Sequence, residues 1–145
     1  MDCLNKFNPC LDSGHNEYAL NYGNNYCNQY ENKLQKFSEE GQQWVGKVRK
    51  CLQNALSDVV GTNITCSDLK RKAFDSHTKC YAESGFCALP VADYYQIMKL
   101  VKGAFVPLSG SSWRSFFNGV ATAGECLSTD ARWQKVYLAV IASIG

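Results

Sequence analysis

Eight cysteines spread along 145 residues are the feature that most constrains what this chain can fold into. Their even number and wide spacing are typical of disulfides formed in an oxidising compartment. Zinc sites use short pairs such as Cys-x-x-Cys with histidines nearby. Here the closest neighbours, Cys3 with Cys10 and Cys80 with Cys87, are each separated by six residues. The pattern therefore predicts four disulfides in a secreted, extracellular protein, with buried free thiols as the alternative.

Length and charge narrow the class of protein further. A chain of this size is expected to form one domain with a core of its own. A net charge of +2 is too small to predict a nucleic-acid partner. The longest apolar stretch, Leu138 to Ile144, is far shorter than the ~20 residues that span a bilayer, so no membrane insertion is expected. Because Met1-Asp2-Cys3 lacks the basic and apolar segments of a signal peptide, we expect Met1 to be an added start on a mature chain.

Apolar periodicity predicts an all-α fold, a single compact disulfide-bonded domain of about six short helices. Residues 1–25 lack this periodicity and are expected to form an irregular arm tied down by disulfides. Ser38 and Thr65 are the expected N-caps, and three glycines are expected to end helices. The expected helices are Asn25 to Phe37, Ser38 to Gly61, Thr65 to Gly85, Val91 to Lys102 before Gly103, Trp113 to Cys126, and Ser128 or Thr129 to Ile144.

Large aromatic side chains fall on the apolar stripes of these helices. That position favours a role in the core over a role in a ligand pocket. The residues are Trp44, Trp113, Phe116, Phe117 and Trp133.

A short segment, Asp75-Ser76-His77-Thr78-Lys79-Cys80-Tyr81, partly resembles secreted phospholipase A2, in which a helical histidine and a carboxylate act beside calcium. Thr78 stands where the metal-binding carboxylate would follow the histidine, and no glycine-rich calcium loop precedes it. The cysteines are expected to be paired and no Gly-x-Ser-x-Gly elbow exists. We therefore expect no catalytic residue and no enzyme activity, with His77 as a packing or surface histidine.

Two further positions carry residue types that occur in metal or modification sites. His15 lies near Asp12 and Glu17, but nothing supplies further ligands at fixed geometry, so no metal or cofactor is expected. Asn63-Ile64-Thr65 is an acceptor triplet for N-glycosylation, placed in the loop between the second and third expected helices. Asn63 is therefore the expected glycosylation site.

The stretch from Tyr26 to Cys87 resembles stanniocalcin, a family of secreted helical glycoprotein hormones. Cys27 and Cys51 enclose twenty-three residues, among which Lys36-Phe37, Gly41 and Val45 match the family's residue types. Fourteen residues then separate Cys51 from Cys66, one fewer than in the family, and thirteen separate Cys66 from Cys80. Cys80-Tyr81, Cys87-Ala88-Leu89 and Glu125-Cys126 match further pieces of the family pattern.

The resemblance implies three bridges, Cys10 to Cys27, Cys51 to Cys80 and Cys87 to Cys126. The cysteines that would bond Cys3 and Cys66 in the family are missing here, so these two are expected to bond each other. An antiparallel hairpin of the second and third helices would allow Cys51 and Cys80 to approach. A later cysteine that links family dimers is also missing, so we expect either a shortened chain or a member that is not a covalent dimer, with a non-covalent homodimer left open.

The resemblance further implies a non-catalytic extracellular protein that acts on calcium and phosphate handling by binding a receptor or inhibiting a secreted metalloproteinase. One alternative is a secreted helical carrier of small apolar ligands, although the close cysteine pair of insect odorant-binding proteins is missing. Another is a venom or parasite effector on a similar scaffold. A carrier needs an enclosed apolar cavity of ~300 Å³ or more, whereas a binding hormone needs a packed core and a functional surface.

Overall fold

The computed structural model describes residues 24–59, 62–105, 119–120, 139 and 142. Every regular element in this part of the chain is helical, which confirms the predicted all-α class at that level. The α-helices are α1 (Asn24–Asn32), α2 (Glu39–Ala55), α3 (Cys66–Glu83) and α4 (Val91–Phe105), and the short 3-10 helices between them are η2 (Leu34–Lys36), η3 (Ser57–Val59) and η4 (Phe86–Ala88).

The start of α2 is fixed by Ser38, as the sequence predicts. The Ser38 hydroxyl oxygen accepts a hydrogen bond from the Gly41 N–H at 3.0 Å. Glu39 and Glu40 occupy the first turn, where their negative charge is favoured by the helix dipole. These local signals are enough to set the first residue of the helix.

The end of α2 differs from the expectation that the helix would run to Gly61. The helix ends at Ala55 and the chain tightens into η3. The Ser57 hydroxyl donates a hydrogen bond to the Asn54 carbonyl at 2.7 Å. A serine that bonds a nearby carbonyl competes with the regular helical ladder, and this competition is the physical reason for the early end.

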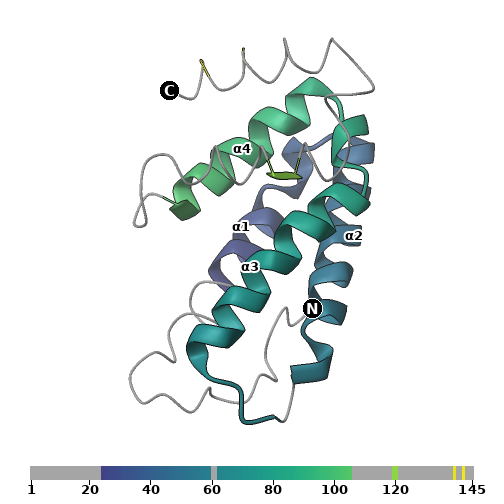
Figure 1. The fold of residues 1–145 in the computed structure, drawn as a ribbon. Helices are drawn as coiled ribbons and strands as arrows, with labels where there is room; N and C mark the ends of the chain where they lie inside the picture. The colour runs from purple at the N-terminus through teal and green to yellow at the C-terminus, as the bar shows by residue number, and fades with distance from the viewer. Residues whose placement is uncertain (1–23, 60–61, 106–118, 121–138, 140–141, 143–145) are drawn as a thin grey trace.

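The helix α3 begins and ends close to the predicted residues. Thr65 is its N-cap, with its hydroxyl oxygen accepting from the Asp68 N–H at 3.1 Å. Gly85 follows the helix with a φ of +95°, a left-handed conformation that glycine adopts without a steric penalty. Figure 1 shows α2 and α3 lying side by side along their length, and the contacts between helices are most extensive for this pair.

The first and fourth helices also depart from the expected bounds. The chain leaves α1 after Asn32 and turns through η2, so the expected single helix to Phe37 is wrong. The helix α4 continues through Gly103 to Phe105. A glycine inside a helix costs only ~1 kcal/mol relative to alanine, so Gly103 alone does not end it.

One core cluster joins the described helices. Trp44, with 2% of its surface exposed, lies in it as predicted. The other aromatic residues assigned to the core, and most of the two expected C-terminal helices, lie outside the described residues. Residues 1–23 of the expected N-terminal arm also lie outside them, whereas residues 24 and 25, expected to end the arm, are already the first residues of α1. The fully enclosed members of the core are Phe86, Ile97, Met98 and Val120.

Candidate functional site

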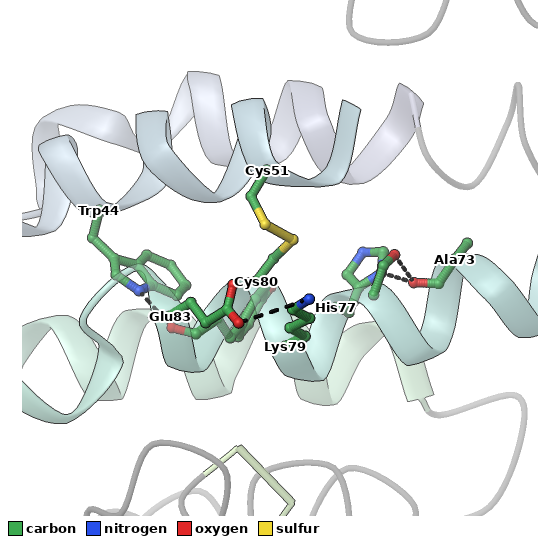
Figure 2. Close-up of a disulfide and its surroundings, with 9 residues drawn as sticks. Trp44, Cys51, Ala73, His77, Lys79, Cys80 and Glu83 are labelled. Atoms are coloured by element: carbon green, nitrogen blue, oxygen red, sulfur yellow. Dashed lines mark hydrogen bonds and ion pairs between the residues drawn. A yellow bond between two sulfur atoms is a disulfide. The ribbon is translucent and has the colours of Figure 1, made fainter. Parts of the chain in front are cut away.

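The best-defined chemical feature is the disulfide between Cys51 of α2 and Cys80 of α3. The two Cα atoms lie 5.6 Å apart, within the range that a disulfide requires. This is the pair that the resemblance implied. Figure 2 shows the bridge crossing between the two helices, with Trp44 on one side of it and His77 on the other. The bridge therefore fixes the two helices to each other between these two side chains.

The other predicted cysteine pairs are only partly described. Cys27 and Cys87 are disulfide-bonded, and no described cysteine is a free thiol. Cys3, Cys10 and Cys126 lie outside the described residues, and of Cys66 only its place at the start of α3 is described. The pairings Cys10 to Cys27, Cys87 to Cys126 and Cys3 to Cys66 therefore stay predictions.

Aromatic residues pack around one end of the bridge. The Trp44 indole N–H donates to the Tyr81 carbonyl at 3.3 Å, and the two rings meet edge to face with centroids 4.8 Å apart. The hydroxyls of Tyr30 and Tyr81 share a hydrogen bond of 3.1 Å. Burial raises the pKa of Tyr81 to about 12 and raises the pKa of Tyr30 well above its ordinary value. Trp44 and Tyr81 thus satisfy their polar groups inside the protein.

His77 lies on the other side of the bridge. Its Nδ1 lies 2.5 Å from the Ala73 carbonyl oxygen, and because a carbonyl can only accept, Nδ1 carries the proton. The ring packs against Phe74 and Tyr81, with centroids 6.4 Å and 6.1 Å away. Burial lowers the pKa of His77, with the Ala73 hydrogen bond opposing that shift. This arrangement is that of a neutral histidine packed within its own helix.

The lowered pKa of His77 gives the fold a pH dependence. Above its ordinary pKa of 6.5 the histidine is neutral in both the folded and the unfolded chain, and its contribution to stability is constant. As pH falls below that value the unfolded chain binds a proton more readily, so stability is lost. Between pH 7.5 and 5.5 we expect His77 to lower the free energy of unfolding by up to about 1 kcal/mol.

Urea unfolding at the two pH values, followed by circular dichroism, measures this effect. His77→Gln is expected to show a smaller loss than the wild type, while Lys79→Gln, an exposed change on the same helix, keeps the wild-type loss. An equal loss in His77→Gln and the wild type would contradict the assignment.

Asp93 is a buried carboxylate that no local sequence pattern predicts. It lies in the first turn of α4 with none of its surface exposed. Its Oδ1 accepts from the Ser38 N–H at 2.9 Å, and its Oδ2 accepts from the Ser38 hydroxyl at 2.5 Å. Asp93 therefore joins α4 to Ser38, the N-cap of α2.

This contact has the form of a capping box completed by another helix. In a capping box, a Glu or Gln three residues after the N-cap accepts from the N-cap N–H. Here the third residue after Ser38 is Gly41, which has no side chain, and Asp93 takes that role from α4. A Cβ at Gly41 would lie 2.5 Å from Oδ2 of Asp93, so the carboxylate occupies the space that glycine leaves.

Asn63 lies where the sequence placed it, in the short loop between η3 and α3. The side chains of Asn63 and Thr65 are both exposed. Thr62 turns the chain by donating from its hydroxyl to the Val59 carbonyl at 2.8 Å. The structure thus presents the acceptor triplet at one end of the α2 and α3 hairpin.

Few reactive, charged or apolar side chains cluster on the surface of the part of the chain that the structure describes. Among the described residues, no three His, Cys, Asp or Glu side chains could jointly hold a metal ion. Val91 and Tyr95 of α4 are the described large apolar residues that are exposed, and Lys99 places its ammonium 5.8 Å from the Tyr95 ring centroid. No helix in the described ranges has the length and apolarity needed to cross a bilayer.

Comparison with known proteins identifies no relative. No protein-family model, no curated protein and no solved structure matches this chain. The stanniocalcin resemblance therefore stays a prediction that is based on the cysteine spacing and the matching residues between the cysteines.

Proposed function

We propose that this chain is a secreted, non-catalytic binding protein whose disulfide-bonded helices display a surface to an extracellular protein partner. The observation that carries the proposal is the pattern of eight cysteines. Two of them, Cys51 and Cys80, form a disulfide between α2 and α3. Disulfides form and persist in oxidising compartments and are rare in the cytosol. The expected single domain of about six helices with a tied N-terminal arm belongs to the same proposal.

The packing of the described helices supports a display role. Trp44 and Tyr81 direct their polar groups into the protein and their rings toward each other. Large aromatic side chains are the residues that a ligand pocket or an enzyme cleft would use most. With these side chains engaged in the core, the exposed faces of the helices are the part of the described protein that remains for recognition.

The stanniocalcin resemblance suggests the more specific form of the function. On that reading the partner is a receptor ectodomain or a secreted metalloproteinase, and the process is calcium and phosphate handling. The chain would be a glycoprotein carrying its glycan on Asn63, without a cofactor, and its self-association would be a non-covalent homodimer.

Affinity capture tests the proposal directly. The oxidised protein, expressed through the secretory pathway, is immobilised and exposed to extracellular fluid of the encoding organism. We expect stoichiometric capture of a receptor ectodomain or a secreted metalloproteinase. This capture should be lost when the immobilised protein is reduced and alkylated, because its disulfides no longer hold the helices together. Recovery of a stoichiometric lipid or other apolar ligand with no protein partner would instead favour the carrier. Retention of the expressed chain in the cytosol with reduced cysteines would contradict secretion.

A further inference from the structure

The hydroxyl of Thr65 is required for two different purposes. In the triplet Asn63-Ile64-Thr65 it is the group that a glycosyl transferase recognises two residues after the acceptor asparagine. In the folded protein the same oxygen accepts from the Asp68 N–H at 3.1 Å, and it lies 3.0 Å from the Asp68 carboxylate, to which it donates. The folded chain therefore uses the proton of this hydroxyl and one of its two lone pairs within α3.

Thr65 cannot leave this position without unfolding the start of α3. Its carbonyl accepts from the Leu69 N–H at 3.0 Å, which is the first helical hydrogen bond, and Leu69 is buried with 6% of its surface exposed. The Thr65 backbone is itself extended, with φ −72° and ψ 155°, but moving this residue away from the helix breaks that bond and loosens the burial of Leu69.

The loop that carries Asn63 is also held at its two ends. The Lys72 ammonium of α3 lies 2.6 Å and 2.5 Å from the two carboxylate oxygens of Asp58 in η3. The Lys72 hydrogen bond is the main cause of the lowered pKa of Asp58. Further along the helices, the Cys51–Cys80 disulfide closes the hairpin. The acceptor asparagine is thus exposed, and the helices η3 and α3 on its two sides are joined to each other.

We infer that Asn63 is glycosylated only before α3 folds, because capping of the helix and recognition of the acceptor triplet compete for the Thr65 hydroxyl. This inference rests on the proposed secretion, since the transferase acts in the secretory pathway. The donor is a lipid-linked diphosphate oligosaccharide. Nδ2 of Asn63 forms a bond to the anomeric carbon of the donor, and the bond from that carbon to the diphosphate oxygen breaks. The lipid diphosphate leaves with the electron pair, and one Nδ2 proton passes to a base of the transferase.

The inference is tested with purified oligosaccharyltransferase and its lipid-linked donor. The substrates are the full oxidised chain and the same chain kept reduced with dithiothreitol, with circular dichroism confirming that helix has been lost. Mass spectrometry before and after treatment with a peptide N-glycosidase gives the rate of modification. We expect the reduced chain to be modified at least several-fold faster, and Asn63→Gln to abolish modification in both states. Equal rates, a faster reaction of the folded chain, or no modification of either would overturn the inference.

A point variant separates the effect of the Thr65 cap on the glycosylation rate from the effect of the disulfides. In the oxidised chain, Asp68→Ala removes the carboxylate that holds the Thr65 hydroxyl and is expected to raise the rate several-fold. Asp75→Ala, an exposed change on the same helix outside the cap, is the matched control and keeps the wild-type rate. An Asp68→Ala rate equal to that of the control would also count against competition for the hydroxyl. Because the rates are measured on purified protein, a failure of secretion in cells would contradict the proposed function without changing this comparison.

Discussion

Asp93→Ala is expected to lower the free energy of unfolding by about 3 kcal/mol, because two partly buried donors lose their acceptor at once. The Ser38 N–H and the Ser38 hydroxyl both direct their protons to this carboxylate. Asp93 has none of its surface exposed, so water cannot replace it without opening the junction of α2 and α4. The measurement is urea unfolding followed by circular dichroism at a wavelength that reports helix.

Asp93→Asn should cost roughly half as much, because its amide keeps one oxygen for the Ser38 N–H and loses only the second acceptor. The Ser38 hydroxyl would then have to accept from both the Gly41 N–H and the new amide. A loss below about 1 kcal/mol for Asp93→Ala would show that the buried carboxylate contributes no more than an ordinary hydrogen bond.

Two glycines of α2 provide a matched pair for the same contact. Gly41→Ala places a methyl group against the Asp93 carboxylate and is expected to destabilise the fold by about 1–3 kcal/mol. At Gly46 an added Cβ meets nothing within 4 Å, so Gly46→Ala is expected to stabilise the helix by roughly 0.5–1 kcal/mol. In the Asp93→Ala background the penalty of Gly41→Ala should largely disappear. An equal penalty in both backgrounds would contradict the proposed clash.

The contrast between the two ends of α2 shows which structure can be predicted from sequence. Ser38 is followed at once by two acidic residues, and that local signal is sufficient to place the start of the helix. The end depends on whether Ser57 turns its hydroxyl toward a carbonyl of the preceding turn. Whether a serine hydroxyl bonds a nearby carbonyl depends on its surroundings in the fold. The apolar stripe does not contain that information, and it therefore predicts a helix that is too long.

Asp93 was missed for a different reason. Its partner Ser38 is 55 positions away in the sequence, so no local sequence pattern predicts the contact. A signal did exist, because Asp93 shares one face of α4 with the buried residues Ile97 and Leu100. A carboxylate in the middle of an apolar stripe must be paired when it is buried. The missing capping-box residue at Gly41 would have suggested what it pairs with.

The candidate functional residues divide in the same way. Asn63 and the cap at Thr65 follow from a few adjacent residues, so their positions were predictable. The packing of His77 against Phe74 and Tyr81 follows from helical spacing, but its lowered pKa depends on burial by the whole fold. A recognition surface consists of the exposed residues that a partner contacts. The spacing of residues in the sequence does not show which exposed residues those are.

Removing the Cys51–Cys80 disulfide is expected to lower the free energy of unfolding by about 3 kcal/mol in the double variant Cys51→Ala with Cys80→Ala. The two cysteines are 29 positions apart. A cross-link that closes a loop of this length removes many conformations from the unfolded chain, and its loss restores them. Cys80 is also buried with 1% of its surface exposed, so its truncation leaves unfilled volume beside the core. Urea unfolding of the otherwise oxidised protein measures the difference.

Gln53→Ala with Lys79→Ala is the matched control, since both side chains are exposed on the same two helices, and it should stay within about 0.5 kcal/mol of the wild type. Peptide mapping without reduction tests the pairing itself, and it should recover a fragment pair that links Cys51 to Cys80. A Cys66 to Cys80 bond would overturn the scheme. Such a bond would join two residues of α3 almost four turns apart, a distance that cannot be bridged while the helix is intact. The mapping result therefore decides between a hairpin of α2 and α3 joined by the Cys51–Cys80 disulfide and a different fold of the chain with other cysteine pairs.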